Sequence, residues 1–111
     1  MLQEFSLSTP REDFYNITSQ LRQAISASGV KDGIAVVFCL HTTAGITINE
    51  NADPDVVHDM LLGLAKTYRE RAEFRHGEGN SAAHLKTKCR RFKRYGDCCR
   101  RRARLLCLKN A

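Results

Sequence analysis

Hydrophobic and polar positions alternate with two different periods in the first third of the chain. Phe5 and Leu7 alternate with polar neighbours, which predicts a half-buried strand at 4–8. Further along, apolar residues recur at helical spacing and are followed by glycine, which predicts an amphipathic helix over 18–28 that ends at Gly29.

The pattern changes again in the middle of the chain. A continuous apolar, β-branched run predicts a strand at 34–40 that is buried on both faces, and a second strand is expected at 45–49. Asp53 and Pro54 form a helix start, because the carboxylate accepts from free N–H groups and proline suits the first helical position. The predicted helix has roughly four turns and an apolar stripe of Val57, Leu61, Leu64 and Tyr68.

Charge and cysteine divide the chain near residue 87. Residues 1–87 carry 8 Lys and Arg against 11 Asp and Glu, a net charge of −3, whereas 88–111 carry 10 against 1, a net charge of +9. Four of the 5 cysteines also follow residue 87, and the stretch 88–104 has neither a helical nor a strand period. We therefore interpret 1–87 as one domain and 88–111 as a basic, cysteine-rich tail.

Polar residues gather between and after the predicted strands. His41, Thr42 and Thr43 lie at the junction of 34–40 and 45–49, and a glycine-rich loop at 75–81 precedes a short helix at 82–85. Simpler interpretations stand beside the functional ones: the threonines suit a strand, and the residues of the glycine loop suit a turn. Asp53 is better explained as a helix cap, His58 as a solvated residue and Cys39 as a small buried hydrophobe.

Three ordered blocks resemble one protein family. Leu40–Glu50, Ala52–Asp55 and Arg75–Lys86 are similar to the YjbQ-like family, the secondary thiamine-phosphate synthase type. The resemblance covers residues 1 to about 87. Family members continue with further strands that include a Gly-Thr-Trp-Gln-Gly block, and this chain has no tryptophan. The resemblance therefore implies that the 1–87 domain is incomplete.

The resemblance implies an α+β fold with a mixed β-sheet and a polar pocket in which the blocks converge, in a homotrimer. Three imidazoles can bind a divalent ion, zinc-like or magnesium, and leave one position open; the metal ligands implied here are His41, His76 and His84. His41, Glu50, Glu78 and His84 are the catalytic candidates. The substrate-binding candidates, which would hold phosphate oxygens, are Thr42, Thr43, Asn49 and Asn80.

The implied activity joins a pyrimidine diphosphate to a thiazole phosphate with release of pyrophosphate. The alternatives are a non-enzymatic protein that binds a metal or a phosphorylated metabolite, and an inactive fragment. The expected partner is a small phosphorylated metabolite, and the expected location is the cytoplasm, because the chain has no long apolar stretch or secretion signal.

The tail fits a reading-frame change. Read one nucleotide later, the codons of Tyr95–Cys99 permit a valine-rich strand like the one that family members have there. A nucleic-acid or metal-binding tail is the competing interpretation, but the cysteine spacing is not that of a paired zinc knuckle.

Overall fold

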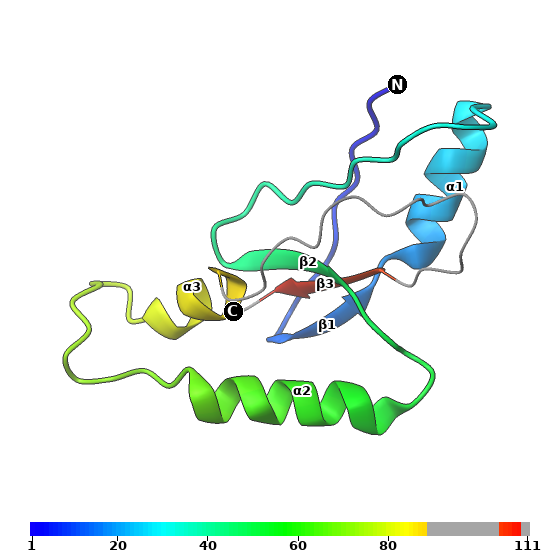
Figure 1. Cartoon of the computed structure of the whole chain (residues 1–111). Helices are drawn as coiled ribbons and strands as arrows, with labels where there is room; N and C mark the ends of the chain where they lie inside the picture. Colours follow the sequence, from blue (N-terminus) through cyan, green and yellow to red (C-terminus); the bar gives the residue numbers. More distant parts are fainter. Residues whose placement is uncertain (89–104, 110–111) are drawn as a thin grey trace.

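The computed structural model describes residues 1–88 and 105–109. In this part of the chain the elements follow in the order β1 (Asp13–Asn16), α1 (Thr18–Ser28), β2 (Ala44–Ile48), α2 (Pro54–Thr67), α3 (Ser81–Lys88) and β3 (Leu105–Lys109). The strands form one sheet of order β1-β3-β2 (Figure 1). The predicted α+β class is confirmed. Both strand pairs among the described residues are antiparallel, whereas the resemblance implied a mixed sheet.

The middle strand of the sheet comes from the tail. Leu108 of β3 lies opposite Phe14 of β1 on one side and opposite Gly45 of β2 on the other. The stretch 89–104, for which no periodicity was found, lies outside the described residues. The division of the chain at residue 87 and the frame change stay predictions.

Both long helices begin and end close to where the sequence predicts. α1 covers 18–28, and Gly29 follows it with φ +69°, a left-handed conformation that glycine adopts without steric cost. The Asp53 carboxylate accepts from the Asp55 backbone N–H at 2.9 Å, so Asp53 is the N-cap of α2. The predicted stripe of α2 is half-buried and His58 beside it is exposed, as expected.

α3 is longer than the predicted 82–85 helix and begins differently. The backbone carbonyl of Asn80 accepts from the N–H groups of Ala83 and His84 at 3.0 and 3.4 Å. The Ala82 N–H donates to the Glu70 carboxylate, which comes from the loop after α2. A carboxylate at a helix N-terminus is favourable because the first N–H groups lack partners within the helix.

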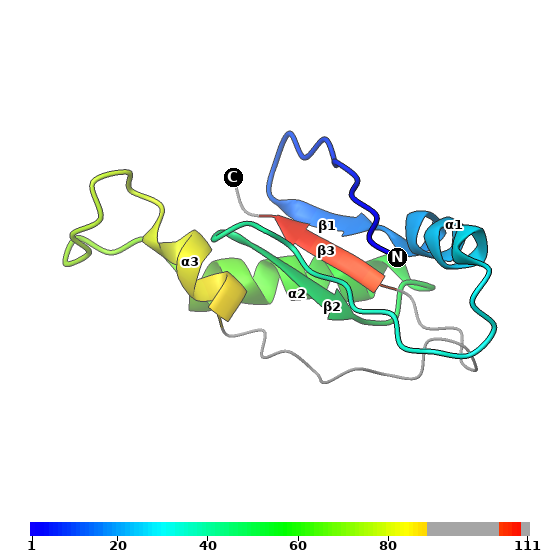
Figure 2. The ribbon, with the colours of Figure 1, turned by 90° about the horizontal axis from the view of Figure 1, so that it is seen from above.

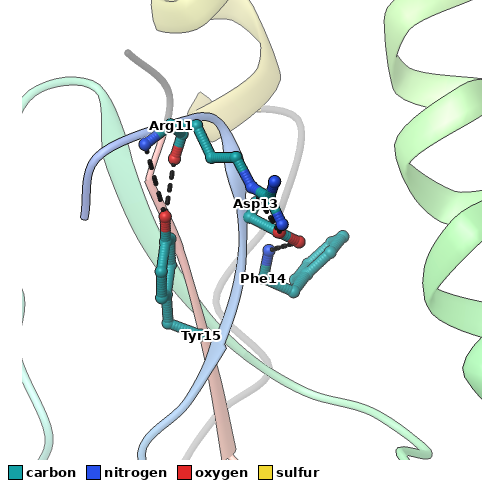
Figure 3. A network of polar contacts seen from close by, with 4 residues as sticks. All are labelled: Arg11, Asp13, Phe14 and Tyr15. Carbon is teal, nitrogen blue, oxygen red and sulfur yellow. Dashed lines mark hydrogen bonds and ion pairs between the residues drawn. The ribbon is translucent and has the colours of Figure 1, made fainter.

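The strand predicted at 4–8 is wrong, and the first strand is β1 instead. A strand requires a neighbour that pairs with its backbone, and β3 gives that pairing to 13–16. Side chains fix the approach to β1 (Figure 3): the Tyr15 hydroxyl donates to the Arg11 carbonyl at 2.8 Å, and Asp13 Oδ1 accepts from the Phe14 N–H at 2.8 Å. Arg11 also forms an ion pair with Asp13 at 3.2 Å.

The prediction that 34–40 is a strand buried on both faces is also wrong. This segment is not assigned to a strand, and its exposure alternates. Val37 and Cys39 are half-buried and pack against the core. The outward residues are 67 to 88% exposed: Ile34, Val36, Phe38 and Leu40. Within the described residues nothing covers this second face. Because only the inner face is covered, exposed and half-buried residues alternate along the segment.

The core is small and lies where α1 joins the sheet. Ile17, only 2% exposed, packs with Leu21 of α1, and the half-buried Leu7, Val37, Cys39 and Ile46 surround them. Figures 1 and 2 place α2 on the side of the sheet opposite the 34–40 segment. The loop that enters β2 therefore lies on one side of the sheet, and α2 lies on the other.

Candidate functional site

The turn that enters β2 contains the first block of candidates. The Thr43 backbone N–H donates to Nδ1 of His41 at 3.2 Å, and the Thr43 hydroxyl oxygen lies 3.1 Å from the same nitrogen. Thr43 is buried, whereas His41 and Thr42 are exposed. The turn thus fixes one edge of the His41 ring and leaves its other edge open to a ligand.

α3 packs against this turn. The Thr87 hydroxyl lies 3.2 Å from the Thr42 carbonyl oxygen and 2.9 Å from the carbonyl oxygen of His84 on its own helix. A Cβ added at Gly45 would lie 3.8 Å from the Thr87 carbonyl oxygen, which is ordinary contact distance. Figure 1 shows α3 beside the start of β2. The block around His41 and the block that ends in α3 therefore meet in space.

His76, in the loop before α3, and His84 of α3 form a pair. Their ring centroids are 5.4 Å apart and the rings meet edge to face at 78°. They line an open pocket of about 470 Å³ together with Phe74, Ser81 and Leu85. Two of the three predicted imidazoles are thus close together.

The glycine loop places polar groups next to this pocket. The Asn80 amide donates to the Glu78 carboxylate at 3.3 Å, and His76 Nε2 lies 3.8 Å from the same carboxylate. The Asn80 side-chain oxygen is buried and has no hydrogen-bond partner among the described residues. Glu78 itself is exposed, so its carboxylate is solvated.

Asn49 and Glu50 lie away from these groups. They follow the last residue of β2, whereas His41 precedes its first, and a strand of this length separates its ends by roughly 20 Å. The Asn49 amide donates to the Glu50 carbonyl at 3.1 Å, a local contact. The fold of a single chain therefore does not join these two candidates to the histidines.

The described residues do not fit the three-histidine metal site. Among them, no group of three or more His, Cys, Asp or Glu side chains lies close enough to hold an ion. His41 also directs Nδ1 at a backbone N–H, so that nitrogen's lone pair is already used.

Sequence reasoning missed a buried ion pair. Lys86 of α3 is 6% exposed, and its ammonium lies 2.8 and 3.0 Å from the two carboxylate oxygens of Glu12. The signal was present in the helical spacing, because Lys86 shares a face with the buried Ala82 and Ala83. This pair connects α3 to the residue before β1.

None of the helices in the described ranges, 1–88 and 105–109, is both long and apolar enough to cross a membrane.

Known relatives agree with the fold. The chain is 51% identical over 88 residues to a UPF0047 protein of Methanocaldococcus jannaschii, a match that covers 78% of this chain and 64% of the relative. It is 47% identical over 81 residues to the UPF0047 protein YugU of Bacillus subtilis, covering 72% of this chain and 61% of that protein. The chain thus spans less than two thirds of these relatives.

Solved structures show the same architecture. A YjbQ/UPF0047 protein of Clostridium acetobutylicum superimposes with a TM-score of 0.76 at 44% identity, covering 98% of this chain and 78% of that one. A YbjQ-like protein of unknown function from Sulfolobus solfataricus gives a TM-score of 0.77 at 24% identity, covering 93% of this chain and 80% of that one, and supports the fold alone. The sequence model described as UPF0047 protein YjbQ-like matches residues 3–92. The chain belongs to the UPF0047 YjbQ-like family.

Proposed function

We propose that this chain binds phosphorylated substrates at the surface formed by the 41–43 turn and α3, and acts as a secondary thiamine-phosphate synthase. The observation that carries the proposal is the contact between the Thr87 hydroxyl and the Thr42 carbonyl at 3.2 Å. It supports a shared site because it brings the His41 block and the His84 block together.

The reaction would join the pyrimidine methylene carbon to the thiazole nitrogen as the carbon–oxygen bond to diphosphate breaks. Pyrophosphate leaves with the bonding electrons, so hydrogen-bond donors must face the departing oxygens. His41 and the exposed Thr42 hydroxyl can supply such donors at the turn. His84, half-buried on α3, is the second imidazole of the proposed site.

Binding without turnover is the second candidate, and one observation favours it. Of the carboxylates expected to transfer protons, Glu50 lies at the far end of β2 and Glu78 is exposed in the glycine loop. The coupling step itself moves no proton, but without a carboxylate within hydrogen-bond reach the turn offers a ligand mainly hydrogen-bond donors. Donors alone would hold a phosphorylated metabolite unchanged.

An assay of the 111-residue chain separates these functions. The pyrimidine diphosphate and the thiazole phosphate are supplied together, and thiamine phosphate is measured alongside calorimetric binding of pyrophosphate. We expect product formation that falls at least about tenfold in His84→Asn, the loss of one hydrogen bond to a charged group. His58→Asn is the matched control, because His58 is exposed on α2 and lies outside the site.

Each outcome has one meaning. Product that depends on His84 supports the synthase. Pyrophosphate binding without product supports the binding protein. If the unaltered chain neither binds pyrophosphate nor forms product, both functions are contradicted.

A further inference from the structure

The hydrogen bonds of the 41–43 turn determine which nitrogen of His41 carries the proton. A backbone amide nitrogen can only donate, and the Thr43 N–H is directed at His41 Nδ1 at 3.2 Å. Nδ1 must therefore present a lone pair. Because Thr43 is only 7% exposed, water competes poorly for its N–H group.

A neutral imidazole has a single N–H, so in this ring the proton is on Nε2. That nitrogen has no hydrogen-bond partner among residues 1–88, and the His41 side chain is exposed. The ring therefore offers a fixed donor to whatever binds beside the turn.

This arrangement is the reverse of the one that metal-binding histidines use. A ligating histidine donates its second N–H to a carbonyl or a carboxylate, which leaves the other nitrogen free for the ion. In His41 the second nitrogen faces the Thr43 N–H, which can only donate, and the Thr43 hydroxyl, which can donate as well as accept. Binding of a metal ion through Nε2 would require a proton on Nδ1. That proton could be directed at the hydroxyl oxygen, but it would oppose the Thr43 N–H and leave this buried donor without its acceptor.

We infer that His41 is held as the Nε2–H tautomer and donates this N–H to a phosphate oxygen of the ligand, instead of binding a metal ion. The tautomer follows from the turn alone, and the identity of the acceptor rests on the proposed function. The exposed hydroxyl of Thr42, the next residue, provides a second donor on the same turn.

The tautomer is measured by long-range proton–nitrogen NMR on the full chain labelled with nitrogen-15 in histidine, above about pH 8, where imidazole is neutral. The His41 signals are those that disappear in His41→Asn. We expect an unprotonated Nδ1 and a protonated Nε2. The two nitrogen signals should not show the averaged values of a ring that exchanges freely between its tautomers. His58 is the internal reference, because its Nδ1 faces the Asp59 carboxylate at 3.1 Å, and a carboxylate favours a proton on that nitrogen.

The donor role is tested with two variants that separate the acceptor at Nδ1 from the donor at Nε2. The Asn side-chain oxygen in His41→Asn can still accept from Thr43 but provides no donor at the Nε2 position. The longer amide of His41→Gln places an N–H near that position. We expect pyrophosphate affinity to fall about tenfold in His41→Asn and by less than about threefold in His41→Gln.

Zinc alone is the third probe. We expect the same zinc affinity in the unaltered chain and in His41→Asn. A proton on Nδ1, or a zinc affinity that falls on loss of the imidazole, overturns the inference. If the unaltered chain does not bind pyrophosphate, the proposed function fails while the NMR result still decides the tautomer.

Discussion

Lys86 shows how one charged residue connects distant parts of this molecule. Its ammonium is buried under α3 and contacts both oxygens of Glu12. Removing one member of such a pair leaves the other charge without its partner in a site that water reaches poorly. The pair thus holds α3, and with it His84, against the segment that enters β1.

We predict that Lys86→Met lowers the free energy of unfolding by about 2 to 3 kcal/mol, below the range for a fully buried pair because Glu12 is one third exposed. The double variant Lys86→Met/Glu12→Gln should lose less free energy of unfolding than the sum of the two single changes. The reason is that Glu12→Gln removes the charge that Lys86→Met leaves unpaired. Urea denaturation measures all three. Lys88→Met, at an exposed position of the same helix, is the control. If the losses of the two single changes simply add in the double variant, Lys86 and Glu12 are not directly coupled.

At the scale of elements, the bounds of the two long helices are determined mainly by residues within or next to each helix. α2 begins with a capping carboxylate and a proline, and its apolar stripe is half-buried. Because these signals lie within a few residues of one another, the sequence predicted the start of α2 and both bounds of α1.

We predict that Asp53→Ala destabilises the chain by about 1 kcal/mol, because the first turn of α2 loses the acceptor for the Asp55 N–H. Asp53→Asn keeps an acceptor oxygen and should stay within about 0.5 kcal/mol of the unaltered chain. Thermal unfolding followed by circular dichroism compares the two. Equal losses in both variants would mean that the charge matters and the cap does not.

The strands were predicted less well because their pairing is not local. Alternation at 4–8 and the apolar run at 34–40 both favour a strand, yet neither forms one and β3 pairs with 13–16 instead. The strand predicted at 45–49 is confirmed within one residue as β2. The geometry of the candidate site could not be predicted for the same reason. The approach of α3 to the 41–43 turn depends on a contact between residues 42 and 87 that no sequence spacing reveals. The tautomer of His41 likewise depends on where the turn directs a single amide.

At the scale of the whole molecule, the chain is less compact than its length allows. Its radius of gyration is 15.5 Å, whereas a compact domain of this length has about 13 Å. The outward row of the 34–40 segment adds an exposed apolar surface, and such surfaces associate with other chains.

We predict that the chain self-associates through this row. The double variant Val36→Lys/Phe38→Lys should shift the sedimentation profile towards monomer, because two lysines place repelling charges on the exposed apolar row. Gln23→Lys, which adds a charge at an exposed position of α1, should leave the profile unchanged. An unaltered chain that remains monomeric at every concentration would contradict the prediction.

The central position of β3 has a consequence for how the protein is made. A ribosome delivers β1 and β2 before β3, although β3 is the strand that both of them require. The helices can form while translation continues, because their hydrogen bonds are local. The sheet has to wait until β3 has been synthesised, so chaperones that protect unpaired strands can act on β1 and β2 in the interval.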